Sequence, residues 1–200
     1  MRILFTGGGT GGHFFPIIAV AREIKRIAEE ERILEKDLYY MGPDDFGTDV
    51  LRQEGIKNVR VLSGKMRRYF SPSNISDVIK LIIGAIQAFW NFFLIMPDVV
   101  FSKGGYGAVP AVLMCAVFRI PLVIHESDSI PGRVSLFSAR IARRVAVAFP
   151  AAADFFPKKK TALIGIPIRK GLLGGIRETA RQNLGVVSNL PALGFIGASQ

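Results

Sequence analysis

A glycine-rich segment followed directly by a histidine stands near the start of the sequence. Residues 7–12 read GGGTGG, and His13 comes next. Glycines let a backbone approach a phosphate closely, and a helix that begins after them offers free N–H groups and a positive dipole. The same dipole favours a neutral imidazole, the form that a general base needs. The segment therefore indicates an anion-binding turn with a candidate base; the alternatives are a turn that binds nothing and a histidine that only caps or packs.

Two further groups of polar and glycine residues follow later apolar runs. Residues 103–107 read KGGYG after an apolar run at 99–101, and His125 with Glu126 follows another at 122–124. In α/β proteins, binding sites gather at the carboxyl ends of parallel strands. Two glycine loops at one such edge suggest a ligand with more than one anionic group, such as a pyrophosphate. An ordinary strand-to-helix turn and a plain hydrogen-bonded strand end are the alternatives.

Short apolar runs alternate with helical patterns along the chain, which is typical of an α/β fold with a parallel sheet. Helices are predicted at 14–30, at 75–95 and up to residue 118. Strands are predicted at 3–6, 38–41, 58–62, 99–101, 122–124, 145–148, 162–164 and 192–196. We therefore expect an α/β fold with a parallel sheet whose carboxyl edge carries the polar groups above.

The helix expected over 75–95 is unusually apolar and is preceded by basic residues. Basic side chains beside exposed apolar ones are typical of an interfacial contact with a membrane. The predicted contact residues are Arg67, Arg68, Ile75, Ile79, Phe89, Trp90 and Phe93. A sheet-covering helix that is buried on most sides is the alternative. Because its longest apolar stretch is shorter than the roughly 20 residues of a membrane span, we do not expect it to cross one.

The composition limits the classes of protein. The 200 residues are 50% hydrophobic, which excludes a disordered chain, and a single cysteine excludes a disulfide scaffold and a cysteine-built zinc site. The formal charge is +10, with seven Lys/Arg and ten Asp/Glu in residues 1–54 but nineteen and six in residues 55–200. Such a balance predicts a polyanionic partner. The apolar run after Met1 is too short for a signal peptide, so we expect a cytoplasmic chain.

The order and spacing of these motifs resemble those of the MurG family over the whole chain. The motifs are GGTGGH at 8–13, GGY at 104–106 with Pro110, HE at 125–126 with IPG at 130–132, Gly165 with Pro167 and Arg169, and SQ at 199–200. Members of this family are glycosyltransferases with two Rossmann-like domains, the GT-B architecture. The chain departs from the family at 127–128, where it has Ser-Asp in place of the usual Gln-Asn.

The resemblance implies an inverting transferase that moves N-acetylglucosamine from UDP-GlcNAc to undecaprenyl-pyrophosphoryl-muramoyl-pentapeptide, with no cofactor or metal. It implies His13, as the base, and Glu126 as catalytic residues. The implied donor-binding residues are Thr10, Gly11, Gly12, Asp128, Arg169 and Ser199. The implied acceptor-binding residues are Gly9, Thr10, Gly104, Gly105, Tyr106 and His125. The protein would lie on the anionic cytoplasmic face of the bacterial inner membrane and would not bind nucleic acid.

The resemblance also implies how the chain is divided. Residues 1–170 would form an N-terminal acceptor-binding domain, 171–190 a linker, and 191–200 the first strand and turn of a donor-binding domain that is otherwise missing. Such a fragment would be inactive alone. A membrane-docking subunit of a split glycosyltransferase, an NAD-binding oxidoreductase domain and a basic nucleic-acid binder are the alternative functions.

Overall fold

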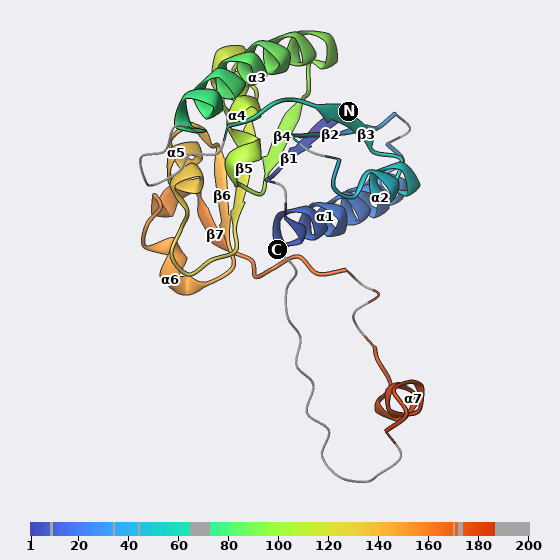
Figure 1. Cartoon of the computed structure of the whole chain (residues 1–200). Coiled ribbons are helices and arrows are strands. Elements are labelled where there is room, and N and C mark those ends of the chain that lie inside the picture. Colours follow the sequence, from blue (N-terminus) through green and yellow to red (C-terminus); the bar gives the residue numbers. More distant parts are fainter. Residues whose placement is uncertain are drawn as a thin grey trace.

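The computed structural model describes residues 1–8, 10–33, 35–43, 45–64, 73–169, 171 and 174–186. They form an α/β domain around a seven-stranded sheet in which each paired strand is parallel to its neighbour (Figure 1). The strands are β1 (Arg2–Thr6), β2 (Asp37–Gly42), β3 (Lys57–Arg60), β4 (Val99–Ser102), β5 (Leu122–Glu126), β6 (Arg144–Val147) and β7 (Thr161–Leu163). Their order is β3-β2-β1-β4-β5-β6-β7. Strands β2 and β3 are added on one side of β1 and strands β4 to β7 on the other, so the switch point of the strand order lies between β1 and β4. The predicted Rossmann-like parallel sheet is confirmed.

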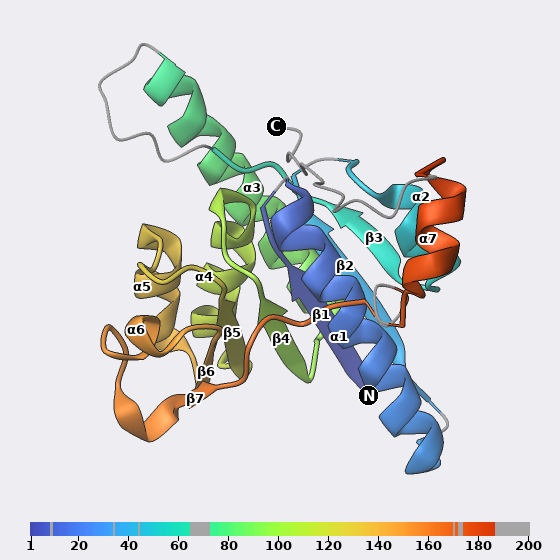
Figure 2. The ribbon, with the colours of Figure 1, turned by 90° about the horizontal axis from the view of Figure 1, so that it is seen from below.

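Helices cover both faces of this sheet. The described helical elements are α1 (Gly11–Glu30), α2 (Thr48–Gln53), α3 (Ser73–Ile95), the 3-10 turn η1 (Tyr106–Ala108), α4 (Val109–Phe118), α5 (Arg133–Ile141), α6 (Pro150–Ala153), the 3-10 turn η2 (Lys158–Lys160) and α7 (Arg177–Asn183). One face carries α1 and α2, and the other carries α3, α4 and α5 (Figures 1 and 2). This layering places the strands between two apolar cores.

The strands are buried on both faces because their side chains alternate. In β1, Ile3 and Phe5 pack in the core beneath α1 and α2, whereas Leu4 packs in the core beneath α3, α4 and α5. Parallel strands buried in this way read as continuous apolar runs, which is why the sequence pattern located them well. The result is a firm support for the loops that leave the carboxyl edge.

One side of α3 is held tightly to the domain. Ala88 and Phe92 are fully buried, and the ring of Phe92 lies 6.0 Å from that of Phe118 at the end of α4. A Cβ on Gly84 would lie 1.7 Å from the carbonyl oxygen of Leu62, so only glycine allows this crossing. The N–H of Leu62 in turn donates to Gln87 Oε1 at 2.8 Å, which fixes α3 along this side.

Short helices are where the structure departs from the sequence prediction. The patterns did not predict α2, α5, α6 or α7, because helices of nine residues or fewer present too few turns for a clear apolar period. α1 also begins three residues earlier than predicted, at Gly11. α7 lies within the predicted linker 171–190 and stands clear of the sheet in Figure 1. The strand predicted at 192–196 lies outside the described residues, so the division into domains stays a prediction.

Candidate active site

Two glycine loops meet where the strand order reverses. β1 and β4 are neighbours, so the loops that follow Thr6 and Ser102 leave the same edge of the sheet side by side. A Cβ on Gly8 would lie 3.1 Å from Gly105 Cα, and a Cβ on Gly105 would lie 2.9 Å from Gly8 Cα. Gly105 also has a φ of +79°, which disfavours other residues. Glycine at both positions thus lets the loops touch at the switch point, where open α/β sheets bind ligands.

His13 stands beside this contact, in the first turn of α1. Its Nδ1 lies 2.8 Å from Thr10 Oγ1, and a Cβ on Gly105 would lie 3.4 Å from its Nε2. Burial lowers the pKa of His13 below its ordinary value of 6.5, and the Lys103 ammonium lowers it further. The carboxylates of Asp128 and Glu126 oppose this shift. The net direction favours the neutral imidazole at physiological pH, as the helix N-terminus predicted.

A cavity of about 240 Å³ opens next to His13. It is lined by His13, by the second glycine loop, by the end of β5 and by the first turn of α5. Among the predicted site residues it brings together His13, Gly105, Tyr106, Glu126 and Asp128. Gly104 is not part of the lining, but a Cβ on it would lie 3.1 Å from Oγ of the lining residue Ser135. The carboxyl edge of the sheet therefore gathers residues from four separate parts of the chain.

Glu126 shapes the wall of this cavity through its backbone contacts. Its Oε1 accepts the N–H of Asp128 at 3.0 Å, and its Oε2 accepts the N–H of Gly132 at 3.3 Å. The side chain is buried, so these charge-assisted bonds are poorly screened. Both oxygens are thus engaged in holding the loop between β5 and α5. This geometry favours a positioning role for Glu126 over proton transfer.

Lys103 lines the cavity, although the sequence analysis did not predict it as a site residue. It is 3% exposed, lines the cavity beside His13, and donates from Nζ to Ser127 Oγ at 2.8 Å. Burial lowers the pKa of this lysine, and the carboxylates of Glu126 and Asp128 oppose the shift. Its place directly before a glycine loop at a strand end was the available signal, but only the sheet order shows that it faces His13.

A second pocket, of about 380 Å³, adjoins the first because Asp128 lines both. Gly11, Gly12 and Arg169 also line it, so four of the predicted donor-binding residues lie together. The guanidinium of Arg169 stacks over the ring of Phe15, with its carbon 4.2 Å from the ring centre. Thr10 instead turns toward His13.

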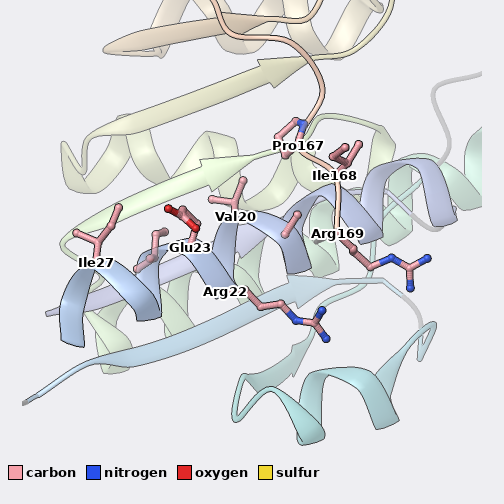
Figure 3. Close-up of a pocket in the computed structure, with 9 residues that line it drawn as sticks. Val20, Arg22, Glu23, Ile27, Pro167, Ile168 and Arg169 are labelled. Atoms are coloured by element: carbon pink, nitrogen blue, oxygen red, sulfur yellow. The ribbon is translucent and has the colours of Figure 1, made fainter. Parts of the chain in front are cut away.

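A third hollow continues from there along the outer side of α1. It has a volume of about 360 Å³ and runs between α1 and the segment after β7. Figure 3 shows Val20 and Ile27 of α1 on one side and Pro167 and Ile168 on the other, with Arg169 at one end. Its lining is mainly apolar, and the sequence prediction did not include it.

Several predicted residues do not join the cavity. His125 is 1% exposed, and its Nε2 lies 2.9 Å from the carbonyl oxygen of Gly165, so its ring is enclosed within the domain and does not line the cavity. Burial lowers its pKa. Gly9, Arg67, Arg68 and Ser199 lie outside the described residues. Over the ranges that the structure describes, no three His, Cys, Asp or Glu side chains are grouped as metal ligands would be.

The outward side of α3 exposes large apolar side chains. The exposed fraction is 72% for Ile75 and 59% for Trp90, and Ile79, Phe89 and Phe93 are also exposed. By length and composition alone the segment Ile75–Ile95 is long and apolar enough to cross a membrane. Its buried side, however, is fixed to the domain through Gln87, Ala88 and Phe92. The alternative of a helix buried on most sides is wrong.

A sheet of this strand order, with glycine loops and a histidine at its switch point, is typical of α/β domains that bind nucleotides or diphosphates. The glycosyltransferase family 28 N-terminal domain matches residues 3–147, and the chain belongs to this family. The Rossmann-like GT-B fold expected from the resemblance to MurG is thereby confirmed.

Bacterial relatives carry related names. The chain is 35% identical over 199 residues to a Bacillus cereus protein named UDP-N-acetylglucosamine–N-acetylmuramyl-(pentapeptide) pyrophosphoryl-undecaprenol N-acetylglucosamine transferase 2. It is 36% identical over 199 residues to a Clostridium botulinum protein that has the same name without the numeral. Each match covers 99% of this chain but 54% of the relative. The chain therefore spans about half the length of these relatives.

Solved structures share the fold. Acinetobacter baumannii MurG matches with a TM-score of 0.64 at 23% identity, over 84% of this chain and 46% of that one. Anabaena Alr3699/HepE in complex with UDP and glucose matches with a TM-score of 0.59 at 16% identity, over 94% and 51%. Neisseria meningitidis UDP-GlcNAc 2-epimerase bound to UDP-GlcNAc matches with a TM-score of 0.62 at 14% identity, over 94% and 55%. At these identities the likeness concerns the fold.

Proposed function

We propose that the chain is the acceptor-binding half of an enzyme that transfers N-acetylglucosamine from UDP-GlcNAc to undecaprenyl-pyrophosphoryl-muramoyl-pentapeptide, the step from lipid I to lipid II in peptidoglycan synthesis. The relatives' names supply the substrates. The observation that carries the proposal is the placement of His13 beside two touching glycine loops in a family 28 domain. A histidine kept neutral at an anion-binding edge suits transfer to a hydroxyl of a pyrophosphate-linked acceptor.

In this reaction His13 is the general base. In the tautomer that this role requires, Nδ1–H donates to Thr10 Oγ1, and the lone pair of Nε2 lies on the side of Gly105 and the cavity. Nε2 takes the proton of the acceptor hydroxyl as that oxygen attacks the anomeric carbon of the donor sugar. The new C–O bond forms while the bond from this carbon to the UDP oxygen breaks, so the configuration inverts and UDP leaves with the electron pair. The proposal includes no metal or cofactor.

The other predicted residues take supporting roles. Glu126 positions the loop that carries Asp128. Asp128, Arg169, Gly11 and Gly12 form the donor side, together with Thr10 and Ser199. The second glycine loop, at Gly104, Gly105 and Tyr106, holds the acceptor pyrophosphate with Gly9. Because the ring of His125 is enclosed, it would not touch the acceptor. It would act indirectly, by holding the backbone at Gly165 in place.

The apolar side of α3 is the proposed membrane contact. Ile75, Ile79, Phe89, Trp90 and Phe93 would enter the acyl boundary, and the charge excess after residue 54, which includes Arg67 and Arg68, would meet anionic headgroups. The enzyme would then lie on the cytoplasmic face of the inner membrane, where a lipid-linked acceptor is within reach.

A transfer assay tests the function. Labelled N-acetylglucosamine is followed from UDP-GlcNAc to the lipid-linked acceptor, both with the 200-residue chain and with the full translation product of its gene. We expect turnover only when a donor-binding half follows residue 200, because the residues described here supply one side of the proposed cleft. Efficient transfer by the 200-residue chain alone would show that the assignment of two halves is wrong, and no transfer by either protein would reject the function.

A further inference from the structure

The ring of His125 is tied to the segment that leaves the sheet after β7. Its Nε2 lies 2.9 Å from the carbonyl oxygen of Gly165. A carbonyl oxygen can only accept a hydrogen bond, so Nε2 carries the hydrogen and donates it. Among the residues that the structure describes, no other hydrogen bond reaches residues 165–169. The bond from His125 is therefore the polar contact that fixes where this segment begins.

The other nitrogen of the same ring is buried. His125 is 1% exposed, and within the described part of the chain its Nδ1 has no hydrogen-bond partner. An unsatisfied buried polar atom is destabilising, and an apolar side chain would fill this space without one. Packing alone therefore does not explain a histidine at this position, whereas the hydrogen bond to Gly165 does.

The segment held by this bond forms a wall of the second pocket. Residues 166–169 line that pocket together with the first turns of α1, and residues 167–169 lie along the outer side of this helix (Figure 3). At the end of the segment, Arg169 stacks over the ring of Phe15, with its guanidinium carbon 4.2 Å from the ring centre. Gly165 makes the turn out of the sheet with a φ of +79°, which favours glycine. The position of Arg169 therefore depends on where this turn is held.

We propose that His125 is a positioning residue for the donor side: by holding the carbonyl of Gly165, it places residues 166–169 and the Arg169 guanidinium at the second pocket. The inference rests on the proposed function, in which Arg169 binds the donor. It replaces the predicted role of His125 in acceptor binding, because the enclosed ring lines neither the cavity beside His13 nor the second pocket. His125 acts on the donor through the backbone, without touching it.

The stacking of Arg169 on Phe15 gives a measurement on the 200-residue chain. Protons above an aromatic ring have shifted NMR signals, so the side-chain signals of Arg169 report whether the segment is in place. His125→Leu removes the donor, whereas His125→Gln keeps an N–H group at a similar distance from the backbone. We expect His125→Leu to lose most of the ring-current shift of Arg169 and His125→Gln to keep most of it.

Gln87→Leu is the control for a general loss of stability. It removes the acceptor of the Leu62 N–H in α3, on the face of the sheet opposite to α1. The melting temperature should therefore fall while the signals of Arg169 stay unchanged. If His125→Leu keeps the Arg169 signals of the unaltered chain, or if Gln87→Leu also loses them, His125 does not position the segment and the proposal is overturned.

Gly165→Ala tests the same link without a change in the core. A Cβ at this position would meet nothing within 4 Å, so the variant should fold, but the φ of +79° disfavours alanine and should displace the turn. We expect the ring-current shift of Arg169 to decrease here too. Unchanged Arg169 signals in Gly165→Ala would show that the turn does not place the guanidinium, and this would also overturn the proposal.

Steady-state kinetics of the full translation product separate positioning from a merely structural role. His125→Leu should raise the KM for UDP-GlcNAc about 10- to 100-fold, as loss of a hydrogen bond to a charged ligand would. The KM for the lipid-linked acceptor should stay unchanged, and His125→Gln should restore most of the KM for the donor. An unchanged donor KM in His125→Leu, or an equal rise in both KM values, would overturn the donor-side role. If the unaltered product transfers no sugar, the proposed function fails, whereas the NMR signals still decide whether His125 holds the segment.

Discussion

The switch-point edge and the outward side of α3 depart from ordinary globular packing in opposite directions. The edge buries polar groups, with Lys103 and Glu126 each at most 5% exposed, whereas α3 exposes Ile75 and Trp90 by more than half. Buried charge and large exposed apolar surface are the two informative exceptions to normal burial. One region gathers buried charged groups, and the other exposes a large apolar surface. Under the proposed function, a lipid joined to a sugar through a diphosphate would contact both regions.

Topology brings these two regions toward each other. α3 follows β3 and leads to β4, so its first residues lie toward the carboxyl edge of the sheet, where the glycine loops are. The segment before α3 is tied to that edge directly, because Ser63 Oγ donates to the carbonyl oxygen of Tyr106 at 2.7 Å. Ile75 and Ile79 therefore lie in the part of α3 that is nearer to this edge, and Phe93 lies near the other end of the helix. Figure 1 shows the course of α3 over the sheet.

The largest expected effect concerns His13 at the polar region. His13→Ala in the full translation product should lower kcat about 10²- to 10⁴-fold, the usual contribution of a general base. Steady-state transfer of labelled sugar measures it. Lys57→Ala is the control and should change kcat less than twofold, because its ion pair with Asp37 is exposed. If His13→Ala keeps activity within about threefold of the unaltered enzyme, His13 is not the general base. The buried polar edge would then have no demonstrated catalytic role.

The second prediction tests the apolar region. The double variant Ile79→Glu, Trp90→Glu should lower binding to vesicles that contain anionic phospholipid by at least about tenfold, because each buried apolar side chain contributes about 1.5–3 kcal/mol. Co-sedimentation measures the bound fraction. Both residues are exposed, so the free energy of unfolding should change by less than about 0.5 kcal/mol per site.

An isoleucine on the opposite face provides the matched control for α3. Ile27 of α1 is 45% exposed, and Ile27→Glu should leave vesicle binding unchanged. If Ile27→Glu weakens binding as much as the α3 variant, general hydrophobicity rather than the α3 surface explains the association. High salt should weaken binding of the unaltered chain, because the basic contribution is screened.

The sequence predicted the parts of both regions that depend on local pattern. The strands and α3 were located because buried parallel strands and a long helix have clear apolar periods. GGGTGG and KGGYG predicted their loops because clusters of glycine between apolar runs mark turns. Pairing between distant residues could not be predicted in this way. The contact of Gly8 with Gly105, the bonds of Glu126 and the place of Lys103 depend on strand order, which no local pattern contains.

The third prediction concerns Glu126. Glu126→Gln should lower the free energy of unfolding by about 1–3 kcal/mol, because an amide nitrogen then faces a backbone N–H where a charged oxygen accepted it. Thermal or urea unfolding measures the change. A positioning role predicts that activity and stability fall together. A loss of activity of about 10²-fold or more with unchanged stability would instead assign Glu126 to proton transfer.

The smallest expected effect is a shift of the pH profile by Lys103. The base acts when His13 is neutral, so kcat/KM should fall as the pH drops through the pKa of His13, which burial and then Lys103 hold below 6.5. Lys103→Met removes the second cause, so the pKa should rise and the acid limb should move to higher pH. The shift should be limited, because burial, the larger cause, remains.

Glu126→Gln should shift the pH profile in the opposite direction in the same measurement. Its carboxylate raises the pKa of His13, so its loss should move the acid limb to lower pH. Opposite shifts in the two variants, measured as kcat/KM against pH with acceptor held below saturation, would show that buried charge at this edge sets the protonation of His13. If the pH profile is unchanged in both variants, His13 titrates independently of Lys103 and Glu126. The buried charges at this edge would then have no part in setting the state of the base.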